Sequence, residues 1–282
     1  MKKLIPLLLT PALLASLLTA CDTADPEDAT ETPKNNYNFT DSDITEPYPA
    51  DFSSYESIVK TYYALARLYI NYEDEKAVNG TYAAMFNIPN ADAQEKFNDL
   101  SYSVLCVYPR LFDRENKESY KQLGYTVKDL NSDGIDELIL RCKNGNVITL
   151  YTMHNGNPIQ LGYFWERCSC RIDPDGLLRI NGSNGADKST TQIYRIASGG
   201  SGLTLLFEGG TDGVDPDTKQ TLYYVLENGE KKHMTKEEYA SLKNSLSYRT
   251  PNESWEDPAH LPFVPLFDNS YVPEYTPSTD KG

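Results

Sequence analysis

Residues 124–153, GYTVKDLNSDGIDELILRCKNGNVITLYTM, decide the fold, because three short apolar runs alternate there with two polar turns. The runs at 124–128, 137–141 and 147–153 have the length and composition of strands. Asn144-Gly145 is a dipeptide typical of the tight turn that joins two antiparallel strands. This segment therefore predicts the beginning of an antiparallel β-meander.

The same pattern continues toward the C-terminus, with turn residues about every ten positions. Further strands are expected at 159–165, 177–180, 191–196, 203–207 and 222–226. Together with the first three, they predict a meander of about seven to eight strands.

Before the meander, apolar residues recur every three or four positions in 53–72 and again in 90–112, which predicts two helices. Ser53 or Ser54 is expected to cap the first helix, and Asn90 the second. Thr235-Lys236-Glu237-Glu238 is a capping box that opens a short helix ending near Ser245. The fold class is therefore α+β, with N-terminal helices, the meander and one short helix after the sheet, in a single domain at 52–246.

The last segment, 247–282, contains six prolines and is expected to be an extended tail. Its apolar run LPFVPLF, residues 261–267, is expected to lie as a strap across the protein's own sheet. The alternative is a motif that binds a partner.

The polar turn Asp129–Glu137 has the spacing of an ion-binding loop. Asp129, Asn131 and Asp133 place side-chain oxygens at alternate positions, Gly134 permits a sharp bend, and Ile135 offers its carbonyl. Oxygen ligands of this kind suit Ca²⁺. A full EF-hand loop has glutamate at position 12, where this chain has Leu140.

The chain has an acidic residue, Glu137, at position 9 of the loop. With this residue, the loop is similar to the loops between strands of FG-GAP repeats. The loop also resembles one in surface lipoproteins of Gram-positive bacteria. These resemblances imply a structural calcium ion with Asp129, Asn131, Asp133, Ile135 and Glu137 as ligands. The alternative is a polar turn without an ion, held by carboxylates that accept backbone hydrogen bonds. A second acidic stretch, 212–217, lacks this spacing and is interpreted as a solvated loop.

The N-terminus has the composition of an export signal. Lys2 and Lys3 precede the apolar run 4–20, which two prolines interrupt and which is short for a membrane-spanning helix. The run ends in Leu18-Thr19-Ala20-Cys21, which resembles the lipobox of bacterial lipoproteins. The resemblance implies a cleaved signal peptide at 1–20, acyl chains such as palmitate on Cys21, and a protein held on the extracytoplasmic face of the cell membrane.

Residues 21–51 would then link the lipidated cysteine to the domain. The stretch 22–51 has nine acidic residues, one lysine and four prolines. This composition predicts a disordered acidic tether.

Four cysteines remain beyond Cys21, namely Cys106, Cys142, Cys168 and Cys170. A bridge from Cys142 to Cys168 or Cys170 is the disulfide hypothesis for an exported chain. The abundant tyrosines, Tyr62, Tyr151, Tyr163 and Tyr223 among them, are expected to pack within the domain.

A net charge of −15 excludes a typical nucleic-acid binder, which needs clustered Lys and Arg. The chain has no nucleophile elbow, zinc-protease motif or phosphate-binding loop, and no catalytic residue can be named. The sequence therefore favours a non-enzymatic membrane-anchored binding module for an extracellular protein or glycan. The alternative is a cell-envelope hydrolase that cleaves glycan or peptidoglycan through acidic residues.

Overall fold

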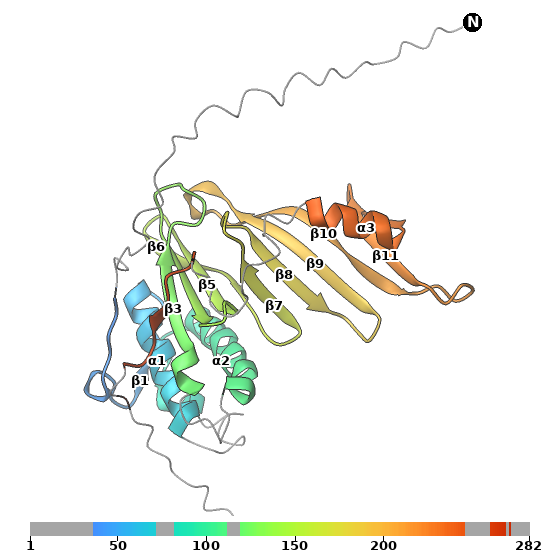
Figure 1. The fold of residues 1–282 in the computed structure, drawn as a ribbon. Coiled ribbons are helices and arrows are strands. Elements are labelled where there is room, and N and C mark those ends of the chain that lie inside the picture. The colour runs from blue at the N-terminus through green and yellow to red at the C-terminus, as the bar shows by residue number, and fades with distance from the viewer. Residues whose placement is uncertain (1–35, 72–81, 112–118, 246–259, 269–270, 272–282) are drawn as a thin grey trace, which may run out of the picture. The chain divides into compact units, whose positions relative to one another are not determined.

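Eleven strands form one sheet in the part of the chain that the computed structural model describes, which is residues 36–71, 82–111, 119–245, 260–268 and 271 (Figure 1). The order across the sheet is β12-β11-β10-β9-β8-β7-β5-β4-β3-β13, and β6 pairs with β5 beside this path. Its strands are β3 (Leu123–Lys128), β4 (Glu137–Cys142), β5 (Val147–His154), β6 (Asn157–Tyr163), β7 (Cys168–Ile172), β8 (Leu178–Ser183), β9 (Lys188–Ile196), β10 (Leu203–Val214), β11 (Thr221–Glu227), β12 (Glu230–Met234) and β13 (Val264–Pro265). All pairs in this sheet are antiparallel, so the α+β class and the meander are confirmed.

The expected number of seven to eight strands was too low. The missed strands β7 and β12 read CSCRI and EKKHM, which contain few of the β-branched and aromatic residues that mark strands. The third, β13, is two residues long and contains a proline. A separate pair, β1 (Tyr48–Pro49) with β2 (Phe86–Asn87), is parallel.

The predicted helices are present as α1 (Tyr55–Asn71), α2 (Ala91–Leu111) and α3 (Lys236–Ser245). Each begins at an expected cap. Ser54 Oγ accepts from the amide of Ser57, and Asn90 Oδ1 accepts from the amide of Ala93. At α3, Thr235 and Glu238 bond each other's backbone amides, as a capping box requires.

Strand β4 lies at the centre of the core, because both of its faces are covered. Leu138 and Leu140 pack in a cluster with α1, α2 and neighbouring strands (Figure 1). Ile139 points to the opposite face, where it joins a second cluster with Leu150 and Leu178. All six β4 residues are buried, including the charged Glu137 and Arg141 at either side of its apolar centre.

The segment expected to be a tether belongs partly to this core. Ile44, Tyr48 and Ala50 are buried in the first cluster, and Tyr37 and Phe39 pack against it. The acidic composition of 22–51 concealed these apolar positions, whose burial offsets the entropy of ordering the chain. The ordered body therefore begins before residue 52, while 21–35 lies outside the described residues.

The apolar run 261–267 lies on the sheet as the predicted strap. Its Val264 and Pro265 pair with Tyr125 and Gly124 of β3, and Leu261 is buried in the second cluster.

One buried cation, Arg141, also holds the strap. This side chain donates to Thr126 Oγ1, at 2.8 Å, and to the carbonyl of Leu261, and its guanidinium lies 4.9 Å from the Phe263 ring centroid. Thr126 in turn donates to the carbonyl of Pro262 at 2.6 Å.

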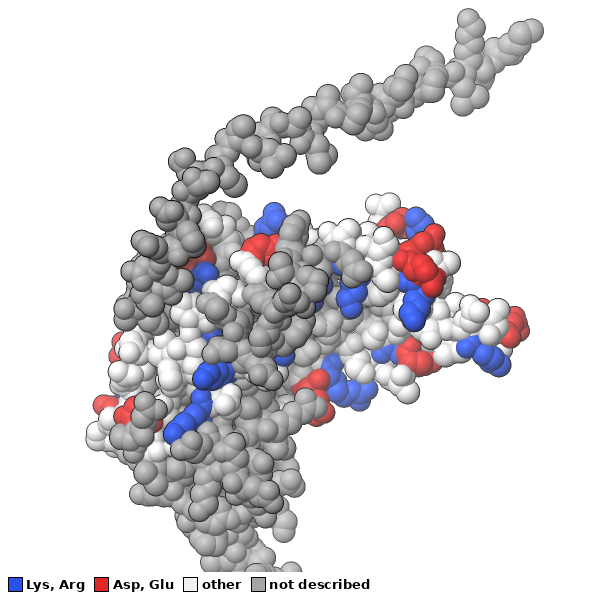
Figure 2. Space-filling view, viewed as in Figure 1, with Lys and Arg blue, Asp and Glu red and all other residues white. Residues whose placement is uncertain are grey.

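The strands β9 to β11 share a smaller third cluster with α3. It consists of Leu177, Ile193, Phe207, Val225 and Tyr239. Beyond it, β12 forms an edge whose first four residues are exposed. Figure 2 shows acidic and basic side chains intermixed on the displayed face of the molecule.

Candidate functional site

The loop Asp129–Glu137 connects β3 to β4 and is folded by its own carboxylates. Asp129 accepts hydrogen bonds from the amides of Asp133, at 3.3 Å, and Gly134, at 2.8 Å. Ser132 and Gly134 have φ of 60° and 85°, so the bend needs two left-handed residues. A Cβ on Gly134 would meet nothing within 4 Å, so it is the backbone conformation that favours glycine there.

Three of the predicted ligands lie directly together. Asn131 Oδ1 accepts from the amide of Asp133 at 3.2 Å, while its Nδ2 donates to Asp133 Oδ2 at 3.0 Å. The amide of Ile135 donates to Asp133 Oδ1 at 2.9 Å. Desolvation raises the pKa of Asp133, but hydrogen bonds to its carboxylate from Gly199, Ile135 and Asn131 together outweigh this effect and lower the pKa.

Glu137 differs from the other predicted ligands because it is fully buried at the start of β4. Its oxygens accept from the amide of Leu130 and from Thr152 Oγ1, each at 2.9 Å. Burial raises the pKa of Glu137 to about 7, the two hydrogen bonds oppose the rise, and Asp133 and Asp129 add to it. Glu137 therefore braces the loop against β5.

Later turns of the chain fasten this loop from outside. The amide of Gly199, in the short helix η5 (Ser198–Gly200) after β9, donates to Asp133 Oδ2 at 2.7 Å. At the turn before β8, a Cβ on Gly176 would lie 1.8 Å from the carbonyl oxygen of Leu130, so only glycine fits there. The loop thus connects the first strands to the β7–β8 and β9–β10 turns.

The loop has side-chain oxygens of the type that calcium prefers as ligands. The carboxylates of Asp129 and Asp133 are held by backbone amides and by Asn131, which are neutral groups. Among the described residues, no Lys or Arg forms an ion pair with Asp129 or Asp133. Within the same residues, no three His, Cys, Asp or Glu side chains converge as a metal-binding group. A cation here would therefore also need the amide oxygen of Asn131 and the carbonyl of Ile135.

The second acidic stretch, 212–217, has ordinary partners. Asp212 pairs with Lys231 at 2.7 Å, and Asp215 Oδ1 accepts from the amides of Asp217 and Thr218. The solvated loop is therefore limited to residues 215–217, because Asp212 and Val214 belong to the paired end of β10.

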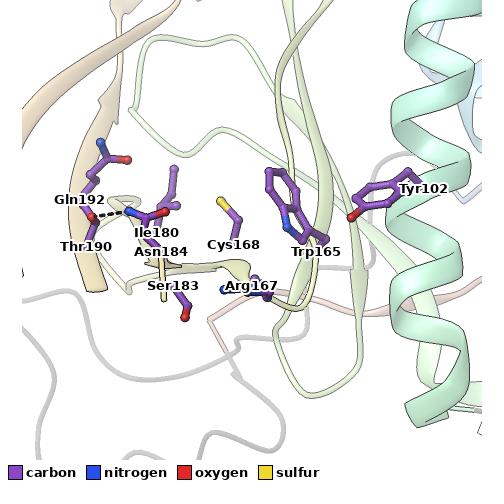
Figure 3. Close-up of a pocket in the computed structure, with 10 residues that line it drawn as sticks. Tyr102, Trp165, Arg167, Cys168, Ile180, Ser183, Asn184, Thr190 and Gln192 are labelled. Atoms are coloured by element: carbon purple, nitrogen blue, oxygen red, sulfur yellow. Dashed lines mark hydrogen bonds between the residues drawn. The ribbon is translucent and has the colours of Figure 1, made fainter. Parts of the chain in front are cut away.

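A groove of about 680 Å³ lies over β7, β8 and β9 (Figure 3). Cys168 pairs with Gly182, and Gly182 with Thr190, so these three neighbours form a row across its floor. Ile180 and Gln192 are paired on β8 and β9, two residues away from the pair Gly182 and Thr190. Because Gly182 has no side chain, the floor is hollow between Cys168 and Thr190.

Aromatic side chains form one wall of this groove. Trp165 stacks on Tyr163, with centroids 5.4 Å apart, and Tyr102 of α2 meets Trp165 edge-on at 6.0 Å. Tyr102 is 49% exposed. Tyr62 and Tyr151 are buried in the core as expected, but Tyr163 supports an open aromatic surface that the sequence did not reveal. Its members come from α2 and from the end of β6 with the residues that follow it, more than 60 positions apart in the chain.

The four cysteines within the described residues are free thiols, so the hypothesis of a bridge from Cys142 to Cys168 or Cys170 was wrong. Cys142 and Cys170 are buried, and burial raises the pKa of both thiols, that of Cys142 to about 12. These two therefore behave as apolar core residues.

Comparisons with protein-family models, with curated proteins and with solved structures found no match for this chain. None of the described helices has the length and apolar character needed to span a bilayer. The predicted lipidation site, Cys21, lies outside the described residues.

Proposed function

We propose that this protein is a lipid-anchored, extracytoplasmic binding module whose sheet is stabilised by a calcium ion in the loop Asp129–Glu137. The carrying observation is the contact between Asp129, Asn131 and Asp133, in which two carboxylates share a loop without a cationic partner among the described residues. Asp129, Asn131, Asp133 and the Ile135 carbonyl would hold the ion, with Glu137 as the neighbouring acidic ligand. The bound ion would offset the repulsion between the carboxylates.

A thermal melt with and without Ca²⁺ tests the ion. The test variant is Asp129→Asn, Asp133→Asn, which removes both charges and leaves one of the two accepting oxygens on each side chain. We expect Ca²⁺, added after chelation, to raise the Tm of the unmodified protein and not that of the variant. The matched control is Asp215→Asn, in a loop with similar hydrogen bonds, and it should keep the full Ca²⁺ response. Equal responses in all three proteins, or none in the unmodified one, would contradict the proposal.

The lipid anchor is supported by the sequence Leu18-Thr19-Ala20-Cys21. Detergent phase partitioning of the expressed protein provides its test. The unmodified chain should enter the detergent phase, and Cys21→Ala should remain in the aqueous phase. Partitioning that does not depend on Cys21 would overturn the anchor.

Binding is favoured over hydrolysis by the chemistry of the groove. A glycosidase needs a pair of carboxyl groups that flank the scissile bond. The groove's lining contains Arg167 and neutral side chains, with no Asp or Glu among its described residues. We therefore infer that a ligand is held there without being cleaved.

A further inference from the structure

The groove over β7, β8 and β9 has two chemically different sides. Figure 3 shows Tyr102 and Trp165 on one side of Cys168, and Thr190, Asn184 and Gln192 on the other. The volume, about 680 Å³, is in the usual range of roughly 300–1,000 Å³ for small-molecule sites. A ligand that fills it must therefore combine an apolar face with a hydrogen-bonding rim.

The aromatic side is a supported platform. The ring of Trp165 lies against Tyr163 at an interplanar angle of 29° and against Tyr102 at 65°. The neighbouring rings restrict the rotation of the indole, which lowers the entropy cost of placing a ligand on it. Trp165 is nevertheless only partly buried, so part of its surface remains open.

The polar side offers donors and acceptors that are only partly used. Asn184 Nδ2 bonds Thr190 Oγ1 at 3.4 Å, which leaves its oxygen and a second N–H. Gln192 Nε2 bonds Glu208 at 2.8 Å, which leaves its oxygen. Arg167 is exposed and has no ion-pair partner among the described residues. These groups match hydroxyl groups, which both donate and accept.

We propose that this groove binds a saccharide, with a pyranose ring stacked on Trp165 and its hydroxyls bonded to Asn184, Thr190 and Gln192. The inference rests on the proposed binding function and names its ligand class. A pyranose has an apolar C–H face and a polar rim, the same division that the groove has. A lipid chain would leave the amide side chains without partners, and a polyanion would find one arginine in a chain of net charge −15.

The test uses the full chain in a detergent without sugar headgroups. Its probes are hexasaccharides of β-1,4-glucose, β-1,4-N-acetylglucosamine, β-1,4-xylose, β-1,3-glucose and α-1,4-glucose, and the trimer of galacturonic acid. Calorimetry measures binding, and chromatography of the mixture detects cleavage. We expect at least one probe to bind and to remain intact.

Two variants test whether the saccharide binds in the groove. Trp165→Ala should weaken it about tenfold, as expected for loss of a stacking surface, while Trp165→Tyr should retain most of it. Gly182→Val should also weaken it at least about tenfold by filling the floor. A Cβ at Gly182 meets only Thr190, at 3.9 Å, so this variant should keep the Tm of the unmodified protein. The control Leu206→Ala, at a 45% exposed residue of β10, should bind normally.

The outcomes separate this inference from the broader function. If no probe binds, or if Trp165→Ala and Gly182→Val bind as the unmodified protein does, the saccharide site is overturned, and a protein ligand remains for the module. If a probe binds through Trp165 and is cleaved, the saccharide site stands, and the non-enzymatic function is overturned.

Discussion

Strands β4 and β5 are covered on both faces, whereas β11 is partly exposed and β12 is almost wholly exposed. The first region packs against α1, α2 and the strap, and it contains the predicted calcium loop at its entrance. The second contributes Val225 to the five-residue third cluster, which it shares with β9, β10 and the ten-residue helix α3. Because burial differs from strand to strand, we expect local stability to differ along this sheet even though its hydrogen bonding is continuous.

The largest expected effect is on the strap, through Arg141→Ala. The variant removes charged donors from Thr126 Oγ1 and from the carbonyls of Cys142 and Leu261 in the buried region. Each buried acceptor left without its donor costs about 1–3 kcal/mol, so we expect a loss of about 3–5 kcal/mol in the free energy of unfolding. Guanidinium denaturation provides the measurement.

The control for this comparison is Arg195→Ala on β9, where the arginine is exposed. Its effect should stay within about 0.5 kcal/mol, as for most surface substitutions. Similar losses in the two variants would mean that the bonds of Arg141 add no more stability to the covered region than an exposed arginine does.

The sequence predicted the covered region well, because apolar runs and caps are local signals. Asn144-Gly145 and Asn90 specify a nearby backbone bend and a helix start, and both are present. The capping box at Thr235, in the exposed region, is an equally local signal and is also present. The burial of Ile44 and Tyr48 was missed because acidic neighbours dominated the composition of their segment.

The candidate loop could be predicted from local sequence, whereas the groove could not. Asp129, Asn131 and Asp133 lie within five positions, so their spacing alone predicted that they meet. Trp165 and Tyr102 meet only because α2 packs beside the sheet, and Gly182 forms a hollow only because of its register with Cys168 and Thr190. Register and helix packing are long-range properties, and no local pattern encodes them.

A second prediction concerns the pH dependence of the covered region, through Glu137. Its pKa is about 7 in the folded chain, against 4.5 as its ordinary value. Between these values the folded state binds a proton that the unfolded state has lost, so the free energy of unfolding falls as pH rises. In chelator, we expect a fall of about 3 kcal/mol from pH 4.5 to above pH 7.

The variant Glu137→Gln imitates the protonated side chain and should remove this slope. It should match the unmodified protein near pH 4.5 and be the more stable of the two at pH 8. Urea denaturation across this range measures the slope, and Glu230→Gln on exposed β12 should retain it. A slope that persists in Glu137→Gln would assign the pH dependence to another group.

The smallest expected effect lies in the exposed region, at the cap of α3. Thr235→Ala removes the hydroxyl that accepts from the amide of Glu238 at 3.2 Å, which costs about 1 kcal/mol. Because Tyr239 is the α3 residue in the third cluster, with its ring tilted against that of Tyr223 at a centroid distance of 5.4 Å, we expect this loss as local opening rather than global unfolding. Hydrogen exchange should therefore accelerate in α3 and β11 and stay unchanged in β4 and β5. Equal acceleration in all four elements would mean that the sheet opens as one unit, and that its open end is as firmly coupled to the core as its covered end.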